Sequence, residues 1–376
     1  MGVKSEYRRL GDIIHPVDRR NVNLSGVGPM GVNIDKFFMP SVANVIGTDL
    51  SNYKLVGFNQ FACNLMHVGR DERLPVALHK GVQEITVSPA YYVFEINEGC
   101  DILPDYLMLW FKRSEFDRNA WYYTDSDVRG GLDKASMYDL KVWVPGQEEQ
   151  RQIVSKYNAV CDRISTCMDF ISNLEKTAQA FYREMFSVAS DNLPDGWTMG
   201  KLADIAEDVG LHINSVRRDN YPIYLPIECL PRKSLLYTES LDVSFAESSL
   251  ITFRKDDIIM GAMRPYFHKV VIARSSGITR STCMVVRPQK ASYWAFLVML
   301  LFSDETIQYA TANSLGTTMP YVNWTIMSKM KTVIPSEDEA QQFNKIFQPI
   351  FEHMSSVIEE VKTLNILKDS LLKKLV

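Results

Sequence analysis

The stretch from residue 263 to residue 274, MRPYFHKVVIAR, places cationic and aromatic side chains close together. Cations can contact phosphates, which sets affinity, while contacts with base edges carry sequence information. The candidates in this stretch are Arg264, Tyr266, His268, Lys269 and Arg274. Ordinary strand surfaces carry the same residue types, so the stretch predicts a nucleic-acid contact without fixing which side chains make it.

Two further groups of polar side chains extend this candidate surface. In the second half of the chain, a pair of arginines adds charge, and NSLGTTMP at 313–320 offers hydrogen-bonding groups. In the first half, Gly130 and Gly131 mark a tight loop that presents an arginine. The additional candidates are Arg70, Arg73, His79, Arg129, Arg217, Arg218, Asn313, Thr317 and Thr318.

Motifs of the common enzyme classes are missing from the sequence. It contains neither a G-x-G-x-x-G cofactor loop nor a G-x-x-x-x-G-K-[ST] phosphate loop. SPAY at 88–91 faintly resembles the N-P-P-Y loop of adenine methyltransferases, but it lacks the amide and the second proline, so we expect a strand there. The six cysteines include no C-x-x-C pair and are expected to be core thiols. We therefore expect a non-catalytic chain that binds no cofactor and no metal.

Charge and composition narrow the class of protein further. With 46% hydrophobic and 11% aromatic residues the chain is globular, and its net charge of −4 argues against a non-specific coat for nucleic acid. Residues 210–290 nevertheless hold 12 Lys and Arg against 7 Asp and Glu, which permits a confined anion-binding surface. No run of 18 apolar residues and no signal peptide is present, so we expect a cytoplasmic protein.

The chain repeats one plan at an offset of 190 residues. VWVPGQEEQRQIV at 142–154 and TVIPSEDEAQQFN at 332–344 each end an extended segment at a proline and continue into apolar heptads. The first heptad positions are Ile153, Tyr157, Val160, Ile164, Cys167, Ile171, Leu174, Ala178, Phe181 and Met185. Their counterparts are Phe343, Phe347, Ile350, Met354, Val357, Val361, Leu364, Lys368, Leu371 and Leu375.

These heptads predict two helices of about 40 residues, each needing a partner. Ser336 and Glu339 predict a capping box at the second helix, and Pro349 predicts a kink or a break within it. The simplest partner is the other helix of the chain, although pairing with other subunits stays open. We expect a mixed α/β (α+β) fold: a domain at 1–145, a helix at 146–188, a second domain at 189–335 and a second helix at 336–376.

This arrangement resembles the specificity (S) subunit of type I restriction–modification systems. The resemblance rests on LPDGW with LADI, DIIMGAMRPYFHK, the loops DVRGGL and SLGTT, and VPGQEEQRQI, and it spans the whole chain. It implies two target-recognition domains that each bind one half of a split sequence in double-stranded DNA. It also implies an antiparallel coiled coil that spaces them and docks two methyltransferase subunits, which carry S-adenosylmethionine and methylate adenine, with restriction subunits completing the complex.

Two departures and two alternatives accompany the resemblance. The second helix start, PSEDEAQQF, lacks the Glu-Gln pair of the first, which puts its docking contacts in doubt. The first domain has no LPDGW opening and carries MHVGRDERLP in place of the MRPY stretch, a divergence expected of domains that bind different half-sites. The alternatives are the specificity subunit of a type IIB-like system and a coiled-coil scaffold whose domains bind peptides.

Overall fold

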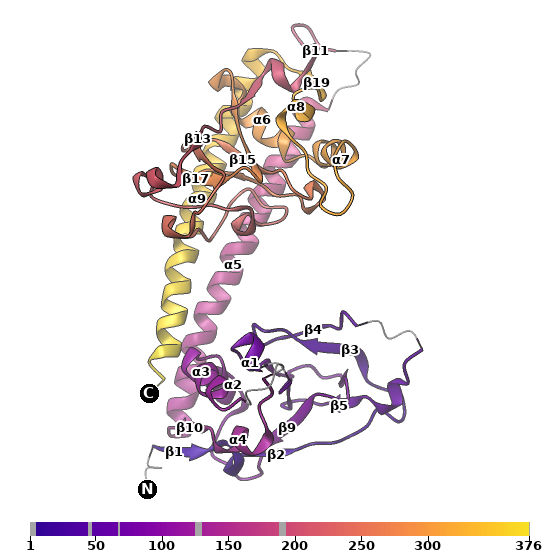
Figure 1. Cartoon of the computed structure of the whole chain (residues 1–376), viewed down its shortest axis with the longest axis vertical. Helices are drawn as coiled ribbons and strands as arrows, with labels where there is room; N and C mark the ends of the chain where they lie inside the picture. Colours follow the sequence, from indigo (N-terminus) through magenta and orange to yellow (C-terminus); the bar gives the residue numbers. More distant parts are fainter. Residues whose placement is uncertain (1–4, 44–46, 67, 125–129, 188–192, 376) are drawn as a thin grey trace. The chain divides into compact units, whose positions relative to one another are not determined.

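The computed structural model describes residues 5–43, 47–66, 68–124, 130–187 and 193–375 (Figure 1). The chain forms two compact units: unit 1 comprises Met1–Asp162 with Ile366–Val376, and unit 2 comprises Arg163–Asn365. Each unit contains a mixed α/β globular part and a portion of both long helices, as the predicted fold class requires.

The globular part of unit 1 is built on two four-stranded sheets. The first has the order β2-β9-β6-β7 and is antiparallel throughout, and the second has the order β4-β3-β8-β5. The first sheet comprises β2 (Ile14–Pro16), β9 (Tyr92–Ile96), β6 (Phe61–Cys63) and β7 (Val76–Leu78). The second comprises β4 (Phe38–Pro40), β3 (Val27–Val32), β8 (Ile85–Val87) and β5 (Lys54–Val56), and β1 (Glu6–Arg9) pairs with β10 (Lys141–Val144). The helices are α1 (Val68–Asp71), α2 (Pro104–Phe111), α3 (Ser114–Tyr122) and α4 (Lys134–Asp139).

Unit 2 repeats part of this topology. Its four-stranded sheet has the order β12-β18-β15-β16, which matches β2-β9-β6-β7, and its β11–β19 pair matches β1–β10. These strands are β12 (Ala206–Asp208), β18 (Cys283–Pro288), β15 (Ile258–Gly261), β16 (Val270–Ile272), β11 (Thr198–Lys201) and β19 (Lys331–Ile334). A second sheet joins β13 (His212–Ile213), β14 (Leu250–Phe253) and β17 (Gly277–Arg280). The helices are α6 (Trp294–Leu301), α7 (Asp304–Ala312) and α8 (Trp324–Met327). The predicted repeat thus appears in the first sheet and in the β1–β10 and β11–β19 pairs, whereas the second sheets differ in strand number and order.

One local prediction is wrong. The segment at 88–91, expected to be a strand, is a turn between β8 and β9, closed by the Tyr91 amide donating to the Ser88 carbonyl at 3.0 Å. Pro89 supplies no amide hydrogen to a strand ladder, and it lies where the chain leaves one sheet for the other. The apolar residues on either side belong to the two flanking strands, which made the whole run look extended.

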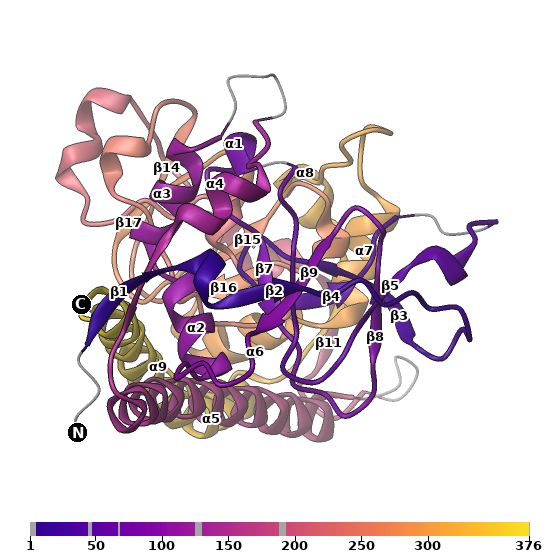
Figure 2. The ribbon, with the colours of Figure 1, turned by 90° about the horizontal axis from the view of Figure 1, so that it is seen from below.

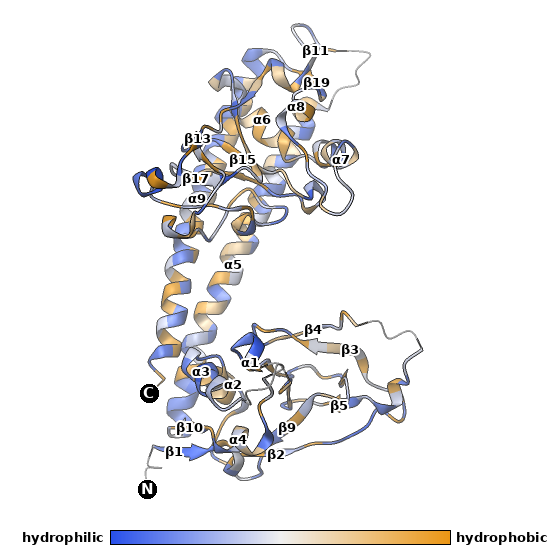
Figure 3. Cartoon of the chain, viewed as in Figure 1, coloured by the Kyte–Doolittle hydropathy of each residue, from blue (hydrophilic) through white to orange (hydrophobic). Residues whose placement is uncertain are grey.

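The two long helices are α5 (Gln147–Phe186) and α9 (Glu337–Lys373). The helix α9 is continuous through Pro349, so of the predicted kink or break the break is absent, and the kink stays a prediction. The predicted cap is present, because the Glu339 amide donates to Ser336 Oγ at 3.4 Å and Ser336 Oγ donates to the Glu339 carboxylate at 2.6 Å. Apolar and polar residues alternate along both helices (Figure 3).

Within unit 2 the helices contact each other in antiparallel order. Arg163 pairs with Glu360 at 2.6 Å, Phe170 contacts His353 with ring centroids 5.2 Å apart, and Tyr182 contacts Phe343 at 6.0 Å. As the residue number rises along α5, the number of its partner falls along α9. Within unit 1, Tyr157 of α5 belongs to the same hydrophobic cluster as Leu371 and Leu375.

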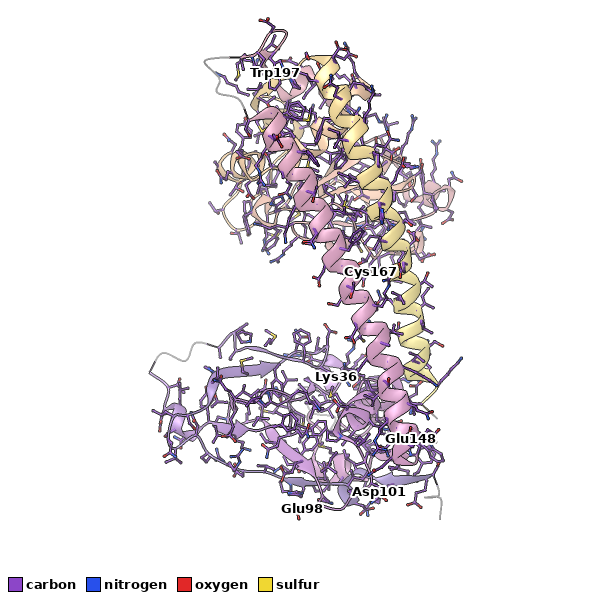
Figure 4. The ribbon with its side chains drawn as sticks, turned by 180° about the vertical axis from the view of Figure 1, so that it is seen from behind. Lys36, Glu98, Asp101, Glu148, Cys167 and Trp197 are labelled. Carbon is purple, nitrogen blue, oxygen red and sulfur yellow. The ribbon has the colours of Figure 1, made fainter. Side chains whose placement is uncertain are left out.

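Burial follows the predicted heptads along most of α5. Tyr157, Cys167 (labelled in Figure 4), Ile171 and Ala178 are buried. Near the end of the helix the pattern shifts: Phe181 is 38% exposed, whereas Tyr182 and Phe186 pack in the core of unit 2. An α-helix has 3.6 residues per turn and a heptad assumes 3.5, so the buried face drifts by about 20° per heptad.

Candidate nucleic-acid interface

The MRPYFHK segment joins β15 to β16 through a single 3₁₀ turn, η7 (Pro265–Phe267). Arg264 precedes this turn and His268 follows it, and both have left-handed backbones, with φ of 49° and 51°. Such conformations are unfavourable for residues other than glycine, so they persist only where the surroundings fix them. The turn is therefore held in one shape.

Two of the predicted contact residues, His268 and Lys269, hold the turn through contacts with backbone carbonyl groups inside the fold. The ring of His268 is buried, its Nε2 lies 3.0 Å from the Phe302 carbonyl oxygen, and burial lowers its pKa. Lys269 Nζ donates to the Ile227 carbonyl at 2.6 Å. Both side chains are thus engaged inside the fold, which leaves Arg264 and the half-exposed Tyr266 as the side chains that the turn presents.

The segment at 313–321 lies directly beside this turn. The Arg264 amide donates to the Pro320 carbonyl at 2.7 Å, and the Val322 amide donates to the Ala262 carbonyl at 2.9 Å. Leu315 and Tyr321 bridge to each other and close the loop, whose tip carries Gly316 at φ 85°. The fold therefore brings together five sequence-predicted residues about 50 positions apart: Arg264, Tyr266, Asn313, Thr317 and Thr318. The last three are exposed.

The other predicted residues of unit 2 lie elsewhere. Arg217 is exposed on η4 (Ser215–Asn220), while Arg218 donates to the Ala246 carbonyl at 2.9 Å. Arg274 stacks on Tyr237, 4.7 Å from its ring centroid, and pairs with Glu359 of α9. Its side chain is 9% exposed, so Arg274 fastens the sheet to the helix and is not available to a ligand.

In unit 1, too, some of the predicted contact residues are exposed and others are engaged inside the fold. Arg70 is exposed and pairs with Asp71 at 2.7 Å, and Arg73 pairs with Asp35 at 3.3 Å. His79 is buried, with Nε2 2.8 Å from the Gln83 carbonyl oxygen and its ring against Phe38. His79 is therefore not available to a ligand at the surface. Arg129 lies outside the described residues.

A loop junction equivalent to that of unit 2 exists in unit 1. The Leu132 amide donates to the Leu65 carbonyl at 2.9 Å, and the Gly69 amide donates to the Gly130 carbonyl at 2.7 Å. A Cβ added at Gly69 would lie 2.6 Å from Gly130 Cα, so both positions need glycine. Leu132 and Val322 are 190 residues apart, the offset of the repeat, so both units hold this loop in the same way.

Residues that position the helices were missed at the sequence level. Gln150 of α5 and Asn344 of α9 are buried and bind backbone groups of the adjoining domain. Trp197 of the LPDGW stretch donates its indole N–H to the Glu339 carboxylate. The only signal in the sequence was an amide residue close to an apolar heptad position, and neither glutamine nor asparagine is distinctive as a residue type.

In the part of the chain that the structure describes, no group of three or more His, Cys, Asp or Glu side chains could hold a metal ion. All six cysteines lie within the described residues and are free thiols. Among those residues no helix has the length and apolar character to cross a bilayer.

Comparison with known proteins gives a consistent result. No family model matches the chain. It is 22% identical, over 94% of its length and 90% of the other protein, to the type I restriction enzyme MjaIX specificity subunit of Methanocaldococcus jannaschii. The chain resembles a type I specificity subunit. Its fold resembles the S subunit of the M. genitalium type I restriction–modification system, with a TM-score of 0.55, 12% identity and coverage of 99% and 96%. The resemblance to specificity subunits that the sequence motifs predict is thereby confirmed.

Proposed function

We propose that this chain is the non-catalytic DNA-specificity subunit of a type I restriction–modification complex. The observation that carries the proposal is the internal repeat. Each unit has one four-stranded sheet of matching order and holds the corresponding loop by a matching backbone junction, in a chain similar to a specificity subunit over 94% of its length. Two similar units with different loop residues suit a target made of two different half-sites.

Each unit contacts DNA through side chains presented by its loops. In unit 2 these are Arg264 and Tyr266 of the η7 turn with the exposed residues of the 313–321 loop, and Arg217 adds a phosphate contact. In unit 1 they include Arg70 and Arg73, whose exposed ion pairs are weak enough to exchange for phosphate. The cations provide affinity that falls with salt, and the base-edge contacts select the sequence.

The partners follow from the same proposal. Two methyltransferase subunits dock on the long helices, bind S-adenosylmethionine and transfer its methyl group to adenine N6, and restriction subunits join them. Each unit alone binds weakly, because one half-site offers few contacts, and joining the units raises the effective concentration of the second contact. The similarity to a type I subunit favours this assignment over the type IIB-like and scaffold alternatives.

The proposal is tested by reconstituting the chain with the methyltransferase subunit encoded beside it. Long-read sequencing of the native genome gives the methylated adenines and hence the split target. The complex is expected to bind and methylate a duplex with that target in preference to one of scrambled sequence at physiological salt. Equal binding of the two duplexes would overturn the proposal.

A further inference from the structure

Three consecutive aromatic residues at the end of α3 belong to none of the hydrophobic clusters that the described residues form. Trp121, Tyr122 and Tyr123 are 44%, 81% and 49% exposed. The rings of Tyr122 and Tyr123 contact each other edge to face, with centroids 5.3 Å apart. Thr124 Oγ1 donates to the Trp121 carbonyl at 2.7 Å, at the end of the helix. An exposed apolar cluster of this size is typical of a binding surface.

The charge beside this aromatic cluster indicates the kind of ligand. Arg118, one turn before Tyr122, has a side chain that is 69% exposed and makes a long ion pair with Glu115 at 3.5 Å. The same helix is fixed by Asp117, which accepts the Leu74 amide at 3.0 Å and so lies against the segment that carries Arg73. Figures 1 and 2 show α1 and α3 close together, and the two helices are in contact. Cations next to exposed aromatic rings suit nucleic acid, with its phosphates and stacking bases.

The repeat locates this cluster at the equivalent of the unit 2 interface. At the offset of 190, the three aromatic residues correspond to Thr311, Ala312 and Asn313. In unit 2, Thr311 and Ala312 line a hollow of about 400 Å³ together with Tyr266. Unit 1 therefore carries large aromatic rings where unit 2 carries small side chains beside a hollow, a difference that would change which bases each accepts.

We propose that Trp121, Tyr122 and Tyr123 stack on DNA bases in the half-site that unit 1 recognises and help to set its sequence preference. This inference rests on the proposed function. The occupant is duplex DNA in which at least one base step opens to admit an aromatic ring, as apolar side chains do in proteins that kink DNA. The rings supply stacking, and Arg118 contacts the adjoining phosphate.

The test uses the chain in complex with its methyltransferase partner. The probes are duplexes of the mapped target with 2-aminopurine at successive positions of each half-site, since its fluorescence rises when it unstacks. The variant is Tyr122→Ala, which removes the most exposed of the three rings. Phe58→Ala, which removes an exposed ring of unit 1 that lies beside Lys80, is the matched control.

Tyr122→Ala is expected to weaken binding of the intact target about 5- to 150-fold, the range for one lost base stack. Discrimination should fall only for changes in the half-site of unit 1, the 2-aminopurine signal there should drop, and the salt dependence should stay unchanged. Phe58→Ala should bind as the parent chain does.

Other outcomes separate the possible failures. Unchanged discrimination by Tyr122→Ala at both half-sites overturns the inference. Loss of assembly with the methyltransferase subunit, without a change in discrimination, would assign the cluster to a protein interface and also overturn it. If the parent complex itself shows no preference for the mapped target, the proposed function has failed, and that result appears before any variant is compared.

Discussion

Gln150 Oε1 accepts the amide hydrogen of Leu103 at 2.8 Å, so the first turn of α5 binds the start of α2. The Gln150 Nε2 group donates to the carbonyls of Asp101 and Pro145 at 2.8 and 2.7 Å. In unit 2 the corresponding position along the chain is Ala340, and Asn344, one turn later, makes three equivalent contacts with the segment that leads into α6. Gln150 of the Glu-Gln pair therefore links the start of α5 to its own domain by hydrogen bonds. In the second copy, Asn344 makes the corresponding link between α9 and its domain.

Replacing Gln150 with alanine should lower the free energy of unfolding of unit 1 by about 1–3 kcal/mol, because buried backbone groups lose their partners. Thermal unfolding followed by calorimetry is the measurement, since the two units need not unfold in a single step. The exposed Gln152 provides the control: Gln152→Ala should leave the transition in place. An equal transition temperature for the two variants would show that the Gln150 contacts contribute nothing.

Replacing Arg264 with alanine should weaken binding of the target by about 1–3 kcal/mol without shifting the unfolding transition, because its side chain makes no hydrogen bond or ion pair within the described residues. Fluorescence anisotropy with labelled duplex measures the first effect and calorimetry the second. A destabilised Arg264→Ala variant would instead mean that the residue supports the η7 turn.

The variant Arg274→Ala should behave in the opposite way. Its guanidinium lies over Tyr237 and pairs with Glu359, so its loss should destabilise unit 2 by about 1–3 kcal/mol. The salt dependence of DNA binding should not change, because no phosphate contact is lost. A shallower salt slope for this variant would place Arg274 on the DNA after all.

Glu175 predicts a pH dependence. Its buried carboxylate on α5 accepts the Leu235 amide at 2.7 Å and Ser234 Oγ at 2.8 Å, and burial raises its pKa above the ordinary value of 4.5. The folded state therefore binds the proton more tightly than the unfolded state. This contribution to stability is present below pH 4.5 and is lost as the pH rises through the raised pKa.

The variant Glu175→Gln keeps an acceptor oxygen for the Leu235 amide and removes the titration. The loss of stability between pH 4.5 and neutrality should be smaller for this variant than for the parent chain in chemical denaturation series. Identical pH profiles for the two proteins would show that Glu175 does not change its protonation on folding.

The buried pair of Lys36 and Asp117 supplies a fifth prediction. The two charged groups lie 2.6 Å apart, with side chains 5% and 11% exposed, and burial lowers the pKa of Lys36. Lys36→Met leaves the Asp117 carboxylate buried beside the Leu74 amide and should cost about 3–5 kcal/mol in the unfolding of unit 1. In Lys36→Met combined with Asp117→Asn, much of that loss should be recovered. A single variant as stable as the parent would contradict the expected cost of an unpaired buried charge.

Much of the fold follows from features that repeat in the sequence. The repeat in the sequence matched the strands of the first sheet of both units, and the heptads located both long helices, because period and burial are coupled in regular elements. Side-chain function was less accessible. The types of His268, Lys269 and Arg274 suit DNA, yet these residues hold the turn and the sheet in place, and only tertiary contacts distinguish the two roles. Trp121 to Tyr123 went unnoticed because aromatic residues in a helix usually belong to a core.

The junctions that hold the loops in both units consist of bonds between peptide groups. Leu132 binds Leu65 and Val322 binds Ala262 through main-chain atoms alone, so these bonds do not depend on the side chains at the exposed loop positions. Only Gly69 and Gly130, which lie against each other in unit 1, are restricted to glycine. Mutations at the exposed loop positions can therefore accumulate without loosening the support beneath them. A lineage of such chains could acquire a new target sequence by small steps, each tested on a scaffold that stays folded throughout.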